Sequence, residues 1–60
     1  MANDSAGGQA LSHESLGVVH EVLGNKAAAV ADYTEAQSLY QSFGDTESAK
    51  RTNSAVTRLK

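Results

Sequence analysis

Residues 10–43, ALSHESLGVVHEVLGNKAAAVADYTEAQSLYQSF, decide the fold because they carry helical apolar spacing on both sides of Gly24-Asn25. Over residues 10–23, His13, Leu16, Gly17 and His20 recur at intervals of three and four residues, which places them on one face of an α-helix. Glycine or asparagine can adopt the left-handed conformation that ends a helix. The stretch therefore predicts two helices joined by a short turn.

The second helix is predicted over residues 26–43 and the third over residues 46–59. An alanine run opens the second helix, Asn25 is placed to cap its start, and Gly44 is placed to end it. Asp45 is placed to cap the third helix, whose apolar stripe is thinner and interrupted by Thr52 and Asn53. No stretch alternates with period two, so we expect an all-α fold: an antiparallel helical hairpin plus a third helix.

Small residues on the facing sides of the first two helices predict a close crossing. Gly17, Ala29 and Ala36 allow the two backbones to approach, and Tyr33 can then cover the contact. Each small residue buries little surface, and the larger neighbour that fits over it compensates.

Length and composition limit what else the chain can be. Its 60 residues have 40% apolar content, but ten of the apolar residues are alanines, so there is room for one small core and one domain over 10–60. Residues 1–9 are predicted to be a disordered lead-in without a targeting signal. No stretch reaches the length of a membrane span, and a chain without cysteine has no disulfide or cysteine-based zinc site. These features favour a cytoplasmic protein.

The hairpin resembles the tetratricopeptide repeat, a helix–turn–helix unit of about 34 residues. The residues that match its pattern without a gap are His13, Leu16-Gly17, His20, Gly24-Asn25, Ala29, Tyr33 and Ala36. The two histidines stand where the family has bulky or aromatic residues, and no proline closes the repeat. The run from Leu39 to Asp45 is similar to the "LYxxxGD" connection of the longer variety of these repeats. The resemblance implies one and a half repeats, with residues 46–60 as the first helix of a second repeat.

Candidate catalytic and metal sites are weak. His13 and His20 lie about 10.5 Å apart along a helix, too far to hold one metal ion together, and we interpret them as substitutes for packed aromatic residues. Asp32 and Glu35 are expected on the exposed side of the second helix rather than as an acid–base pair. We therefore predict no enzyme, no metal and no cofactor.

A binding surface is the better prediction. In the family that the chain resembles, the first helices line a concave groove that receives peptides. The matching positions here are Leu11, Glu14, Val18, Glu21 and Val22, followed by Lys50, Asn53 and Thr57 on the third helix. Exposed valines flanked by acids would suit a helix or an extended peptide with basic residues. The resemblance thus implies a scaffold for protein–protein interaction.

Two alternatives remain open at this point. The exposed apolar flank of the first helix could pack against a second copy of the chain, giving a homo-oligomer. Residues 50–60 carry four bases and no acid, which could suit nucleic acid, but the charge of −6 on residues 1–49 argues against that partner.

Overall fold

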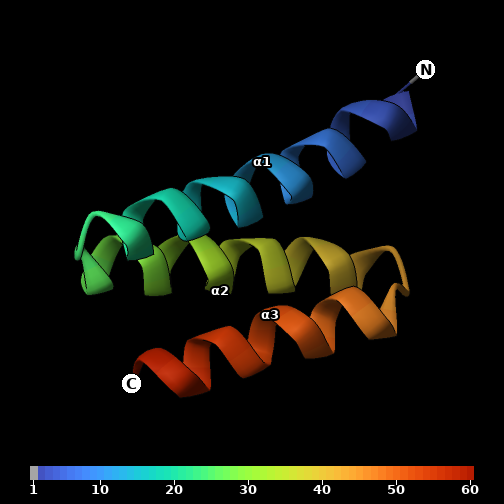
Figure 1. The fold of residues 1–60 in the computed structure, drawn as a ribbon. Helices are drawn as coiled ribbons and strands as arrows, with labels where there is room; N and C mark the ends of the chain where they lie inside the picture. The colour runs from blue at the N-terminus through green and yellow to red at the C-terminus, as the bar shows by residue number, and fades with distance from the viewer. Residues whose placement is uncertain (1) are drawn as a thin grey trace.

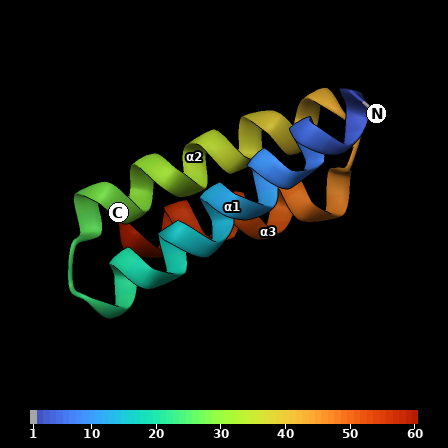
Figure 2. The same cartoon turned by 90° about the horizontal axis from the view of Figure 1, so that it is seen from above.

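The computed structural model describes residues 2–60, with side chains from Gly8 onward. It consists of three helices: α1 (Ala2–Val22), α2 (Lys26–Ser42) and α3 (Thr46–Leu59). Consecutive helices run antiparallel, and α2 lies between α1 and α3 in Figure 1. Seen from above, α1 and α3 lie toward the same side of α2 (Figure 2). The predicted all-α fold, a hairpin followed by a third helix, is confirmed.

The two turns end and restart the helices in the same way. Gly24 and Gly44 have φ values of +83° and +78°, which residues other than glycine rarely adopt. Asn25 Oδ1 accepts a hydrogen bond from the backbone N–H of Ala28 at 3.2 Å, and Asp45 Oδ1 accepts one from Ser48 at 3.2 Å. The predicted caps are therefore in place, and α2 and α3 have almost the predicted bounds.

The start of α1 differs from the prediction. A disordered lead-in was expected over residues 1–9; Met1 lies outside the described residues, and residues 2–9 belong to α1. Extending a formed helix adds one hydrogen bond per residue without a new nucleus. No proline stands in residues 2–9, and two glycines weaken a helix without ending it. The local composition therefore could not place this boundary.

The core forms two small clusters, each built around one tyrosine of α2. Tyr40 packs with alanines from all three helices, and Tyr33 packs with Ala29, Ala55 and Val56. Gly17 of α1 is buried against the ring of Tyr33, where an added Cβ would stand 3.1 Å from three ring atoms. The predicted close crossing of α1 and α2 under Tyr33 is confirmed.

Thr52 shows why the third helix looked thin from its sequence. It is fully buried, although a hydroxyl was expected to interrupt the apolar stripe. Its Oγ1 donates to the backbone carbonyls of Ser48 and Ala49, both at 3.0 Å. Because backbone carbonyls of the same helix accept a hydrogen bond from this hydroxyl, Thr52 can fill a core position without an unsatisfied polar group.

Within residues 2–60, none of the helices combines the length and hydropathy that crossing a bilayer requires.

Candidate interaction surface

Two Glu–Tyr–Arg sets link the three helices, and the two sets are spaced alike. The first consists of Glu14, Tyr40 and Arg51, and the second of Glu21, Tyr33 and Arg58. Within each helix the two members lie seven residues apart, which is close to two helical turns. Because α2 runs antiparallel to its neighbours, the order of its tyrosines is reversed and both sets form.

In the first set, one carboxylate holds both other side chains. Glu14 Oε1 accepts from the hydroxyl of Tyr40 at 2.8 Å and from Arg51 Nη2 at 3.0 Å. Glu14 Oε2 accepts from Arg51 Nε at 2.7 Å, so the guanidinium binds in a bidentate manner. The guanidinium carbon also lies 5.9 Å from the centre of the Tyr40 ring. This set ties α1 to α3 across α2.

The second set repeats the arrangement nearer the end of α1. Glu21 Oε1 accepts from the hydroxyl of Tyr33 at 3.2 Å and from Arg58 Nη2 at 3.1 Å. Arg58 Nη1 pairs with the other carboxylate oxygen. Tyr33 is the same residue whose ring covers Gly17, so its two ends serve packing and hydrogen bonding at once.

The charges of these sets shift their protonation equilibria. The hydrogen-bonded Arg51 guanidinium lowers the pKa of Glu14, and Arg58 lowers the pKa of Glu21 in the same way. Burial raises the pKa of both Tyr33 and Tyr40, and the neighbouring carboxylates act in the same direction. The acids are therefore held ionised and the tyrosines neutral at pH 7.

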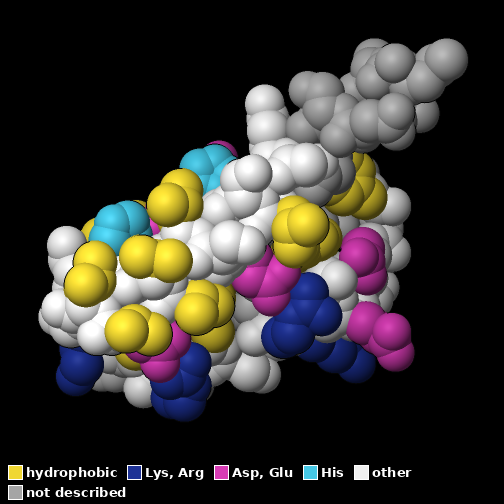
Figure 3. Space-filling view, turned by 45° about the horizontal axis from the view of Figure 1, so that its top comes forward, with side chains coloured by type: hydrophobic (Ala, Val, Ile, Leu, Met, Phe, Trp, Pro, Cys, Tyr) yellow, Lys and Arg dark blue, Asp and Glu magenta, His cyan; other side chains and the backbone are white. Residues whose placement is uncertain are grey.

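A groove lies between α1 and α3, and these sets form part of its walls. It is lined by Glu14, Val18, Tyr33, Arg51, Ser54, Ala55 and Arg58. In Figure 3, two pairs of acidic and basic side chains lie side by side along this flank, with apolar side chains between them and the two histidines. Glu14 and Glu21 were predicted to attract a basic peptide, but their carboxylates are already bound to arginines of the same chain.

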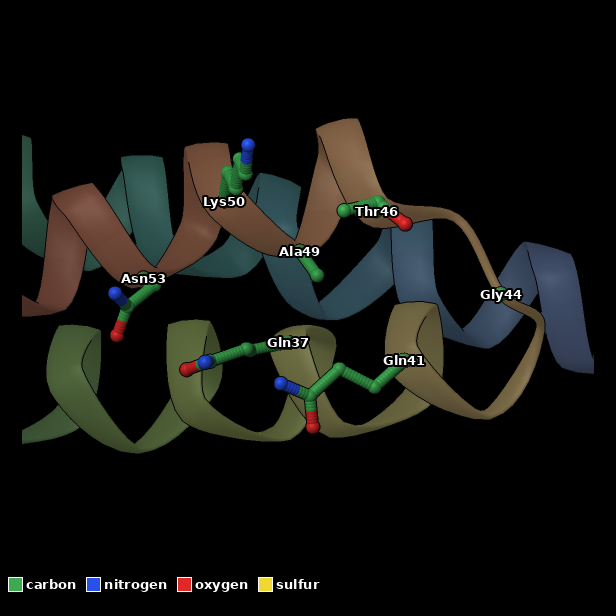
Figure 4. Close-up of a pocket in the computed structure, with 7 residues that line it drawn as sticks. All are labelled: Gln37, Gln41, Gly44, Thr46, Ala49, Lys50 and Asn53. Carbon is green, nitrogen blue, oxygen red and sulfur yellow. The ribbon is translucent and has the colours of Figure 1, made fainter.

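The third-helix residues of the predicted site lie elsewhere. Lys50 and Asn53 line a cleft between α2 and α3 together with Gln37 and Gln41 (Figure 4). Thr57 is exposed and lines neither this cleft nor the α1–α3 groove. The residues of α3 that hydrogen-bond to α1 are Arg51 and Arg58, which the groove positions implied by the resemblance did not include. Their matched spacing with Glu14 and Glu21 is the sequence signal that could have identified them.

The apolar part of the predicted site is open to solvent. Leu11, Val18 and Val22 are between 49% and 81% exposed. A second exposed line, not selected from the sequence as a binding surface, consists of Leu16 and Val19 of α1 and Leu23 at the start of the turn that follows. Five large apolar side chains of α1, and Leu23 in the turn after it, are thus 46% to 81% exposed, which is typical of an interaction surface.

The two histidines meet an acid instead of filling aromatic positions in the core. His20 donates from Nδ1 to Asp32 Oδ2 at 2.6 Å, and His13 Nδ1 lies 3.7 Å from Asp32 Oδ1. Asp32 was expected on the exposed side of α2, but its side chain is only 17% exposed; Glu35 is exposed as expected. Helical periodicity does not determine which residues of α1 and α2 face each other, so it could not place Asp32 beside the histidines. Among the described residues, no group of three or more acids and histidines is arranged to hold a metal ion.

Comparisons with protein-family models, curated proteins and solved structures give no match to this chain.

Proposed function

We propose that the chain is a protein-interaction module of tetratricopeptide-repeat type, about one and a half repeats long, that binds a peptide or a partner helix through the exposed surface of α1. The support for the repeat assignment is the hairpin itself, with Gly17 beneath Tyr33 and a glycine turn capped by Asn25. The observation that carries the function is the exposure of Leu11, Val18 and Val22 beside the α1–α3 groove.

The ion pairs at the groove restrict which kind of partner can bind there. Glu14 and Glu21 each bind an arginine, so a basic ligand would have to displace Arg51 or Arg58 before it could reach them. We therefore propose recognition by apolar contacts, with a partner that presents two or three large apolar side chains. The same pairing argues against catalysis, because Glu14, the one acid among the described residues that line the groove, is bound to Arg51, and Glu21 beside it is bound to Arg58. The absence of cysteine suits a reducing compartment, so we place this function in the cytoplasm.

A selection experiment tests the proposal. Peptides selected from a random displayed library on the immobilised chain should be amphipathic and should bind with little dependence on salt, because no ion pair is formed. Val22→Glu should weaken their binding at least tenfold, since it places a charge in the contact. Thr34→Glu, at an exposed β-branched position on α2, is the matched control and should leave binding unchanged.

Two results would overturn the proposal. One is a selection that enriches no peptide over an unrelated three-helix protein. The other is enriched peptides whose binding responds to neither Val18→Glu nor Val22→Glu, with circular dichroism showing that the variants are folded.

A further inference from the structure

The stripe Leu16, Val19 and Leu23 is centred on another flank of the first helical segment than Leu11, Val18 and Val22, which the proposed function uses. At about 100° per residue, Val19 lies about 200° around α1 from Gly17, which faces Tyr33. Leu11, Val18 and Val22 lie toward the α1–α3 groove, whereas Leu16 and Leu23 lie on the opposite flank, on the side of the two histidines. The stripe borders the line of Val18 and Val22 at Val19, and its three side chains are between 46% and 74% exposed.

The spacing of the stripe fits a second helix. Leu16, Val19 and Leu23 follow one another at i, i+3 and i+7, the seam through which two helices pack at a shallow angle. Ser12 and Ser15 flank the seam on the same exposed side of α1. Because both are small, they allow another helix to approach closely.

The charge of this surface points to a second copy. From Gly8 to Leu23 the formally charged side chains at pH 7 are Glu14 and Glu21, and both are held by arginines on the other flank. A two-fold interface pairs each patch with itself, so a neutral apolar patch is complementary to its own copy where a charged patch would repel it. Helices that lie on lipid surfaces carry Lys or Arg on their polar face, and α1 has none.

The area that the stripe can bury indicates how large the contact between two copies can be. A specific interface of standard size takes about 800 Å² from each partner, which is about a fifth of the 3900 Å² surface of this chain. Three apolar side chains that are 46% to 74% exposed, with Ser12 and Ser15 beside them, offer less than that area. We therefore expect a weak dimer, at the low end of the size range of specific interfaces.

We propose that the Leu16–Val19–Leu23 stripe pairs with the same stripe of a second copy, in a two-fold antiparallel contact between the two α1 helices. In this arrangement Val19 lies beside the axis and meets Val19 of the second copy. Leu16 then packs against Leu23 of the second copy, and the helix dipoles run in opposite directions, which is favourable.

Sedimentation velocity over roughly 5 to 500 μM tests the proposal directly. The wild-type chain should pass from monomer to dimer over this range. Val19→Glu should remain a monomer, because it would bring two carboxylates together at the axis. Thr34→Glu should dimerise like the wild type, and circular dichroism should show the same helix content for all three chains.

A cysteine experiment keeps the test valid if Val19→Glu fails to fold. The natural chain has no cysteine, so Val19→Cys introduces the only thiol. Mild oxidation should crosslink Val19→Cys rapidly into a disulfide dimer, whereas Thr34→Cys should crosslink at least tenfold more slowly. A two-fold axis beside residue 19 requires this difference.

Three results would overturn the inference. The first is a wild-type chain that remains monomeric at 500 μM. The second is a dimer that is lost on Val22→Glu but not on Val19→Glu, which would place the contact on the proposed peptide surface. The third is a monomer that binds phosphatidylcholine vesicles through Val19, which would assign the stripe to lipid. Because peptide binding is measured with Val22→Glu, either proposal can fail while the other stands.

Discussion

Substituting alanine for each of two glycines of α1 tests the packing of the hairpin. Gly17 and Gly8 both stand inside the helix, so each gains about 0.8–1.0 kcal/mol of helix propensity on becoming alanine. At Gly17 the new Cβ would stand 3.1 Å from three atoms of the Tyr33 ring, whereas at Gly8 nothing lies within 4 Å. The difference between the two variants therefore isolates the cost of crowding Tyr33.

The magnitude follows from what Tyr33 can do. Its ring is buried in the core and its hydroxyl is bound to Glu21, so a shift of a few tenths of an ångström disturbs both contacts. Overpacking a filled core costs about 1–3 kcal/mol, which exceeds the gain in helix propensity. We expect Gly17→Ala to lower the free energy of unfolding by about 0.5–2 kcal/mol, and Gly8→Ala to raise it by up to about 1 kcal/mol.

Thermal unfolding followed by circular dichroism at one fixed protein concentration measures both changes. In a domain of this size 1 kcal/mol corresponds to about 4–8 °C in Tm, so the two variants should differ by at least several degrees, in opposite directions from the wild type. Equal changes in Tm for Gly17→Ala and Gly8→Ala would refute the close crossing of α1 and α2.

Three further predictions concern the links between the helices. In a double-mutant cycle, Glu14→Gln and Arg51→Met should show a coupling of about 0.2–1 kcal/mol at low salt that falls in high salt, because Arg51 is largely exposed; a coupling unaffected by salt would contradict the ion pair. Stability should fall as pH drops below about 4.5, because Glu14 and Glu21 have lowered pKa values in the folded chain and their contribution is lost as pH falls through those values; urea unfolding at pH 7 and pH 3 measures this, and equal midpoints would contradict it. Asn25→Ala should cost about 0.5–2 kcal/mol by removing the cap of α2, and Asn25→Asp should retain most of the stability; a loss that is equal for the two variants in chemical denaturation would argue against the cap.

Local patterns predicted the helices well because local interactions determine them. Glycine turns followed by Asn25 and Asp45 determine where α2 and α3 begin. The small residue Gly17 correctly indicated a close contact with Tyr33. The predicted start of α1 was wrong because no residue near position 10 stops a helix that is already formed.

The tertiary register was beyond the reach of the same patterns. Glu14 was predicted to be free for a partner, but which residue of α3 faces it depends on how two helices sit on α2. The groove positions implied by the resemblance include Lys50 and Asn53, which lie in the α2–α3 cleft, and do not include Arg51. Asp32 was misplaced for the same reason, since its burial depends on histidines twelve or more residues away.

The most direct test of the account is a map of the contacting surface by NMR on dilution of the isotope-labelled chain. We predict that the largest concentration-dependent amide shifts fall at Leu16 and Val19 of α1 and at Leu23 directly after it, while the amides of Asn53 and Thr57 of α3 stay unchanged. Shifts confined to the cleft between α2 and α3, or no change anywhere along α1 at the highest concentration, would contradict the claim that the Leu16–Val19–Leu23 stripe forms a contact between two copies of this protein.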